Sequence, residues 1–183
     1  MPVRSVCVFC GARPGHDPKY MATAAAVGQM LAEDGRRLVY GAGDVGLMGA
    51  TARAVQEAGG KTFGVIPSHL VAWEVGKRDL TQYIVVETMH ERKKVMFMNS
   101  DVIVVLPGGA GSLDEFFEVL TWRQLGLHQK PIFLLNTEGY WTPLIQLLDH
   151  VVAQGFAGEN VKSFVQSVES VQDLRMALRA ALS

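Results

Sequence analysis

Short apolar runs that alternate with longer helical patterns constrain the fold of this 183-residue chain more than any other feature. Several runs, such as DVIVVLP at 101–107, are continuously apolar and rich in Val and Ile. That composition is typical of strands buried on both faces of a parallel sheet. We predict six strands and a shorter seventh, at 5–10, 36–41, 61–67, 82–87, 101–107, 131–136 and 163–167.

Helical patterns fill the intervals between these runs. The stretch 17–35 begins with Asp17 before a proline, a good N-cap and first helical position, and ends at a glycine. The stretch 112–126 begins with Ser112 and Glu115 at the spacing of a capping box. Further helices are predicted at 46–60, 88–100, 142–155 and 169–183. The alternation predicts an α/β fold, a Rossmann-like doubly wound parallel sheet flanked by helices, with residues 1–183 as one domain.

Composition excludes several classes of partner. The formal net charge is −1, so no basic excess is available to hold nucleic acid through its phosphates. The N-terminal apolar run is too short and too soon interrupted for a signal peptide. No stretch approaches the roughly 18 apolar residues of a membrane span. We therefore expect a soluble cytoplasmic protein that binds neither nucleic acid nor membrane.

The two cysteines have the C-x-x-C spacing of redox and metal sites. Cys7 and Cys10 lie on a predicted strand, however, and positions three apart on a strand point to opposite faces. No third cysteine is present to complete a four-thiolate zinc site. Buried reduced thiols in a reducing compartment are the favoured interpretation, and no metal is expected.

Four informative stretches follow predicted strands or begin predicted helices. In a parallel α/β sheet these positions share one edge, where ligands bind outside the carboxyl ends of the strands. The stretches are CGARPG at 10–15, GAGDVGLMG at 41–49, TMHERKK at 88–94 and PGGAGSLDE at 107–115. The least regular part of the chain, 68–81, is a candidate flap over this edge.

The segment PGGAGSLDE points to an anion site. Its glycines allow a tight turn and close approach to a ligand, and the following helix N-terminus presents unpaired N–H groups. Together they favour phosphate, with the Ser112 hydroxyl as a further donor. Asp114 and Glu115 either stabilise the helix start or place a carboxylate beside the sugar of a bound nucleotide, as in carboxylate-assisted glycosidic cleavage. The alternative is a structural turn with Ser112 as N-cap.

Other motifs are weaker. GAGDVG fits G-x-G-x-x-G, but the next strand lacks the acid expected in dinucleotide-binding proteins. Arg92 and Lys93 lie early in a helix, where the dipole disfavours cations, so they call for an anionic partner: a ligand, or Glu87, Glu91 or Glu115. His90 is either a general base or a surface residue.

Taken together, these motifs resemble those of the LOG (Lonely Guy) family, cytokinin riboside 5′-monophosphate phosphoribohydrolases once labelled "lysine decarboxylase". The family pattern P-G-G-x-G-T-x-x-E matches 107–115, with Ser112 in place of Thr. Its M-H-x-R-K matches 89–93, its G-L-M-G matches 46–49 and its C-G-x-x-x-G matches 10–15. The resemblance covers roughly residues 4–155.

The resemblance implies a homodimer that hydrolyses the N-glycosidic bond of a nucleoside 5′-monophosphate, without a cofactor, to the free base and ribose 5-phosphate. It implies that Arg92 and Glu115 are catalytic and that Gly109–Ser112 hold the phosphate. The substrate-binding positions that it implies are Glu74, Lys93, Gly108, Gly109, Ala110, Gly111, Ser112, Leu113, Asp114 and Thr121.

One departure from the family lies in the second loop, where Ala42 stands in place of a glycine that many relatives have. Two other functions compete with hydrolysis. A nucleotide carrier on the same fold would keep the glycine loop but would not need Arg92 and Glu115 together. A pyridoxal phosphate decarboxylase would need a Schiff-base lysine, and none lies in a recognisable cofactor motif. Neither the preferred base nor the biological role follows from the sequence.

Overall fold

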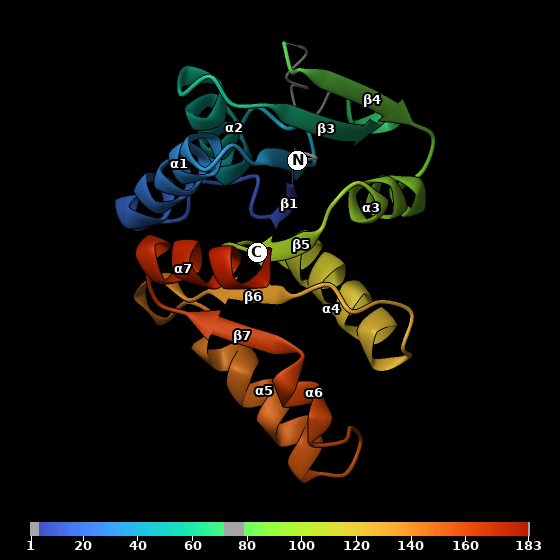
Figure 1. The fold of residues 1–183 in the computed structure, drawn as a ribbon. Helices are drawn as coiled ribbons and strands as arrows, with labels where there is room; N and C mark the ends of the chain where they lie inside the picture. Colours follow the sequence, from blue (N-terminus) through green and yellow to red (C-terminus); the bar gives the residue numbers. More distant parts are fainter. Residues whose placement is uncertain (1–3, 72–78, 183) are drawn as a thin grey trace.

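A seven-stranded, all-parallel sheet forms the centre of the molecule (Figure 1). The computed structural model describes residues 4–71 and 79–182. All seven predicted strands are present: β1 (Ser5–Phe9), β2 (Arg37–Tyr40), β3 (Thr62–Pro67), β4 (Gln82–Val86), β5 (Val102–Val105), β6 (Ile132–Leu135) and β7 (Val165–Val168). The predicted Rossmann-like doubly wound architecture is confirmed.

The strand order is β4-β3-β2-β1-β5-β6-β7. The chain builds outward from β1 in one direction through β4, then returns to the other side of β1 with β5. The connections that leave β1 and β5 therefore diverge to opposite faces of the sheet. Such a topological switch point opens a crevice at the carboxyl ends of the two strands, which is where α/β proteins bind ligands.

Helices cover both faces of the sheet (Figure 1). One face packs against α1 (Pro18–Glu33), α2 (Gly46–Glu57) and α7 (Val171–Ala181). The other face packs against α3 (Met89–Met98), α4 (Ala110–Gln124), α5 (Thr142–Ala153) and the short α6 (Asn160–Ser163). Two 3-10 turns, η1 (Ser68–Leu70) and η2 (Thr137–Gly139), complete the described elements, and neither these turns nor α6 was predicted.

The predicted start of α1 is confirmed. Asp17 is the N-cap, and its carboxylate accepts a hydrogen bond of 2.9 Å from the Lys19 N–H. The helix packs closely on α2 through Gly28, since a Cβ there would lie 2.3 Å from the Thr51 carbonyl oxygen. Glycine thus sets the distance between α1 and α2.

The predicted start of α4 is wrong. The helix begins at Ala110 with Gly109 as N-cap, and no side chain caps it. Ser112 is therefore in the first helical turn, and it forms no capping box with Glu115. The glycine turn is shorter than expected, so the helix begins inside the glycine motif and the Ser112 side chain is left for another role.

The edge strand β4 also differs from expectation, because its apolar residues are not covered on both faces. Val85 is 51% exposed, and Ile84 is also exposed. These exposed side chains give β4 an apolar surface beside α3.

Within the described part of the chain, no helix is long and apolar enough to cross a membrane.

Candidate active site

A cavity of about 430 Å³ opens at the switch point between β1 and β5. This volume suits a small-molecule ligand. The walls come from all four sequence stretches that were expected to share one edge of the sheet, and that expectation is confirmed. The lining residues are Val8, Cys10, Gly11, Ala12, Arg13, Pro14, Gly15, Tyr20, Gly41, Leu47, Met48, Met89, Arg92, Met96, Pro107, Gly108, Gly109, Gly111, Ser112, Glu115 and Tyr140.

Gly11 ties three of the loops together. Its N–H donates to the Pro107 carbonyl at 3.0 Å, and its own carbonyl accepts from the Leu47 N–H at 3.0 Å. A Cβ at Gly46, which has a φ of 57°, would lie 2.3 Å from the Ala12 carbonyl carbon. The glycines here allow backbone to touch backbone, so the loops after β1, β2 and β5 form one continuous wall.

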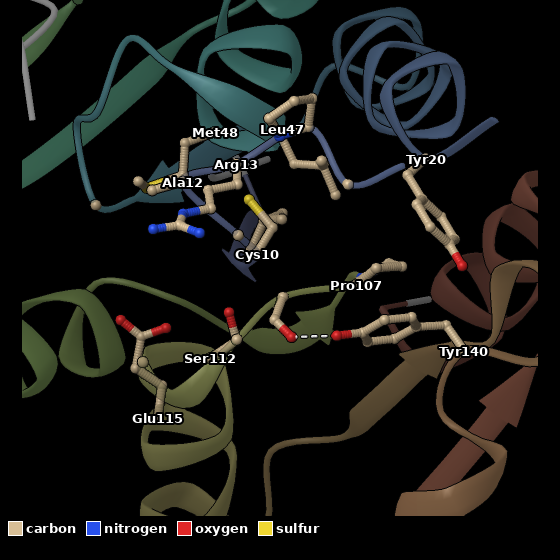
Figure 2. A pocket seen from close by; sticks show the side chains of 18 of the residues that line it. Cys10, Ala12, Arg13, Tyr20, Leu47, Met48, Pro107, Ser112, Glu115 and Tyr140 are labelled. Carbon is tan, nitrogen blue, oxygen red and sulfur yellow. Dashed lines mark hydrogen bonds between the residues drawn. The ribbon is translucent and has the colours of Figure 1, made fainter. Parts of the chain in front are cut away.

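The N-terminus of α4 faces this wall without a side-chain cap. The first N–H groups of a helix have no partner within the helix, and the helix dipole adds a partial positive charge. Ser112 is 4% exposed and lines the cavity, and its hydroxyl has no hydrogen bond to any residue that the structure describes. Figure 2 shows this hydroxyl directed into the cavity. The arrangement provides N–H and O–H donors for an anion.

Glu115 lines the same cavity one turn further along α4. Its charge acts on the Cys10 thiol, whose pKa is raised chiefly by burial and further by the Glu115 carboxylate. Cys10 therefore stays protonated near neutral pH and contributes an apolar, uncharged surface. Both cysteines are free and buried, and they pack in the cores on opposite faces of the sheet, as predicted.

Arg92 is held by the backbone of β3 and of the loop after β2. It is 4% exposed, its Nε donates to the Val65 carbonyl at 3.0 Å, and one Nη donates to the Gly41 carbonyl. The guanidinium is thus a positive charge held rigidly by backbone oxygens on the cavity wall.

Lys93, the next residue on α3, is used differently. Its Nζ lies 2.9 Å from an Asp114 carboxylate oxygen and also pairs with Glu118. An anionic partner for Lys93 was expected, either a ligand or one of three glutamates. The protein partners are Asp114 and Glu118 in place of Glu87, Glu91 or Glu115. Burial lowers the pKa of Lys93, but the hydrogen bonds that Lys93 donates to the two α4 carboxylates outweigh that effect, so the net shift of the Lys93 pKa is upward.

The structure brings together about half of the predicted site residues. Arg92, Glu115, Gly108, Gly109, Gly111 and Ser112 line the cavity. Five others do not line it: Lys93, Ala110, Leu113, Asp114 and Thr121. Glu74 and half of the predicted flap, residues 72–78, lie outside the described residues. His90 is exposed and does not line the cavity either. In the described ranges, no three His, Cys, Asp or Glu side chains could hold a metal ion.

One arginine and two tyrosines in the cavity wall were not predicted as site residues: Arg13, Tyr20 and Tyr140. The two tyrosine rings meet edge to face at 5.6 Å at the opposite end of the cavity from Glu115 (Figure 2). The Tyr140 hydroxyl donates to the Gly108 carbonyl at 2.5 Å and so supports the glycine turn. Arg13 could have been predicted, since it lies inside the CGARPG stretch. No motif near Tyr140 indicates a site residue, because its partner Gly108 lies 32 residues earlier in the chain.

Comparisons with known proteins agree with this arrangement. Residues 48–178 match the family model described as "possible lysine decarboxylase". A solved molybdenum cofactor binding protein from Rippkaea orientalis has the same fold, with a TM-score of 0.75 and 22% identity over 100% of this chain and 99% of that one.

Curated relatives are closer in sequence. The cytokinin riboside 5′-monophosphate phosphoribohydrolase of Rhodococcoides fascians is 43% identical over 178 residues, 97% of this chain and 90% of the relative. The enzyme LOG of Oryza sativa subsp. japonica is 39% identical over 96% of this chain and 72% of its own length. The chain therefore belongs to the LOG family, the family that carries the older description "possible lysine decarboxylase".

Proposed function

We propose that the chain hydrolyses the N-glycosidic bond of adenosine 5′-monophosphates, N6-modified cytokinin ribotides and AMP itself, to the free base and ribose 5-phosphate. The observation that carries the proposal is the pairing, in one cavity, of an uncapped helix N-terminus with a carboxylate one turn along the same helix. The first feature suits a phosphate, and the second suits the sugar beside it. The names of the curated relatives give the same reaction.

The mechanism follows from the charges on the cavity wall. Glu115 orients a water molecule and stabilises positive charge at C1′ as the bond from C1′ to the base nitrogen lengthens. The bonding electron pair leaves with the base, which takes up a proton. The water oxygen bonds to C1′ and loses a proton. Phosphate binding supplies energy at a distance from the reacting bond.

Arg92 acts as a fixed positive charge rather than as a proton donor. Its carbonyl contacts hold the guanidinium in place, and the high pKa of arginine makes proton release unfavourable. In the proposed reaction it orients the departing base or the catalytic carboxylate by electrostatic attraction.

The decisive experiment incubates the purified protein with AMP and with N6-isopentenyladenosine monophosphate. Free base and ribose 5-phosphate are followed by chromatography. We expect Glu115→Gln and Arg92→Ala each to reduce kcat by about 10²–10⁴-fold, the range for removal of a positioned catalytic group. His90→Ala is the matched control, because His90 is exposed on the same helix as Arg92 and does not line the cavity.

Nucleotide binding without cleavage would instead favour the carrier function. The ratio of the two rates in the wild-type protein would report the preferred base.

The proposal extends to assembly. Exposed apolar residues occur on three elements that contact one another through α3: Val85 on β4, Met98 at the end of α3, where it is 67% exposed, and Phe117 on α4. We propose that a second copy covers this face in a homodimer, with residues 1–183 of each copy acting as one domain in the cytoplasm. Light scattering of the eluting protein tests this, with Val85→Glu expected to shift the mass toward the monomer.

A further inference from the structure

Arg13 extends into the cavity from the loop after β1. It is exposed, and no hydrogen bond or ion pair joins it to the residues that the structure describes. The other arginine in the wall, Arg92, is held by two carbonyls. Arg13 is thus a cation in the cavity wall whose N–H groups are available to a ligand.

Arg13 faces the start of α4 across the cavity, where it can contact a ligand bound to that helix. Figure 2 shows Arg13 on the wall opposite Ser112 and Glu115. The loops that carry these two walls are joined by the hydrogen bond from the Gly11 N–H to the Pro107 carbonyl, so the backbone limits their separation. A group that accepts hydrogen bonds from the Ser112 hydroxyl and the first N–H groups of α4 therefore lies between this helix start and Arg13.

Charge balance points to the same conclusion. A bound phosphate monoester carries close to two negative charges at neutral pH and lies near the Glu115 carboxylate in the proposed function. The partial positive charge at the start of α4 is about half an elementary charge, and Arg92 adds one full charge on the same cavity wall. Together these are too small to offset both anions. Arginine supplies a full charge and a planar pair of N–H donors that match phosphate oxygens.

We propose that Arg13 forms the second half of the phosphate site and selects nucleoside 5′-monophosphates over nucleosides. The identity of the phosphate as that of the nucleotide rests on the proposed function. Arg13 binds the phosphate from the side opposite Ser112, so the anion is held between the loops after β1 and β5. It is a positioning and specificity residue for the glycosidic cleavage.

The first test measures binding without catalysis. Ribose 5-phosphate is titrated calorimetrically into the wild-type protein, Arg13→Ala and Arg13→Lys. We expect the Kd to rise about 10- to 100-fold in Arg13→Ala, the range for a hydrogen bond to a charged group. The Kd of Arg13→Lys should lie between those of the wild type and Arg13→Ala, because lysine keeps the charge but loses the planar donor pair. His16→Ala is the control, since it changes an exposed residue near the same loop that does not line the cavity.

The second test measures kcat/KM for AMP and for adenosine. Arg13→Ala should lower the value for AMP by a similar factor and leave that for adenosine unchanged. Equal losses for both, or wild-type affinity for ribose 5-phosphate, would overturn the inference. If AMP is cleaved as well by Arg13→Ala as by the wild type, the role of Arg13 fails and the proposed function stands. If the wild type binds ribose 5-phosphate through Arg13 but cleaves no nucleotide, the phosphate site stands and the proposed function fails.

Discussion

At the scale of single residues, the cavity depends on backbone that only glycine allows to pass so closely. A Cβ at Gly108 would lie 2.0 Å from the Ser112 hydroxyl oxygen and 2.9 Å from the Gly11 nitrogen. One methyl group would therefore displace the hydroxyl that faces the cavity and also separate the two loops. A Cβ at Gly109, the next residue, would meet no neighbouring atom within 4 Å.

We predict that Gly108→Ala lowers the free energy of unfolding by about 1–3 kcal/mol, because overpacking forces the neighbouring atoms to shift. Binding of ribose 5-phosphate should weaken at the same time, since the Ser112 hydroxyl is moved. Urea unfolding and calorimetry measure the two effects. Gly109→Ala is the comparison for stability. An equal loss of stability in both variants would show that the close contact at Gly108 is not the cause.

Ala42 has a backbone conformation that is unusual for a residue other than glycine. Its φ of 59° is in the left-handed region that favours glycine, and its methyl group is fully buried. The family resemblance implied that glycine is usual here. The backbone conformation explains why, because alanine tolerates this region at a cost that a bulkier or β-branched residue would increase.

At the scale of elements, the ion pairs of Lys93 join α3 to α4, the two helices that carry Arg92 and Glu115. Lys93 is buried, so removing it leaves the α4 carboxylates close together without a cation. Lys93 therefore acts on the geometry between the two helices. This differs from the direct substrate contact that the family resemblance implies for it.

We predict that Lys93→Met lowers the free energy of unfolding by about 1–3 kcal/mol and reduces kcat more than it raises KM. The double variant Lys93→Met with Glu118→Leu should regain most of the stability, because an apolar pair can replace a partly buried ion pair. Chemical unfolding and steady-state kinetics provide the measurements. A change in KM alone at unchanged stability would instead support direct contact with the substrate.

The packing of α1 on α2 supplies a second prediction at this scale. Gly28→Ala would bring a Cβ to 2.3 Å from the Thr51 carbonyl oxygen and 2.9 Å from the Ala54 side chain. We expect a loss of about 1–3 kcal/mol in the free energy of unfolding, although alanine has the higher helix propensity. Gln29→Ala, at an exposed neighbouring position, should change it by less than about 0.5 kcal/mol. A Gly28→Ala variant as stable as the wild type would contradict the prediction.

Periodicity predicted the strands and long helices because burial of apolar side chains is a local property of the sequence. The capping-box spacing of Ser112 and Glu115 gave the wrong start for α4, because the glycine turn lets the helix begin three residues earlier, with Gly109 as N-cap. Periodicity could not find Tyr140, whose role depends on a tertiary hydrogen bond to Gly108. The helix dipole indicated an anionic partner for Lys93 but not which carboxylates supply it, because side-chain partners between helices follow from helix packing.

At the scale of the whole molecule, Asp34 joins the end of α1 to the C-terminal helix. Its carboxylate accepts hydrogen bonds from Arg175 at 2.6 Å and from Arg179 at 2.9 Å, and Arg175 lies 141 residues later in the chain. Burial raises the Asp34 pKa, but the arginine hydrogen bonds outweigh it, so the net shift is downward. The buried carboxylate thus holds α7 against the rest of the fold.

Stability should therefore depend on pH through Asp34. A lowered pKa in the folded state adds stability above the unfolded value of about 3.9, and this stability is lost as the pH falls through the folded value. We predict that Asp34→Asn is less stable than the wild type by about 1–3 kcal/mol at pH 7. The difference should shrink below about pH 4. Thermal unfolding from pH 3 to 8 measures it, and a difference that is independent of pH would contradict this role.

The hydrogen bonds of Gly11 have a consequence for how the family diversifies. Because one residue links the loops after β1, β2 and β5, none of these loops can change length or course without disturbing the other two. The course of the three loops around the cavity is thus fixed by their shared contacts. A change of ligand in this cavity is therefore expected to come from exchange of side chains at its rim, more readily than from insertion or deletion in the loops.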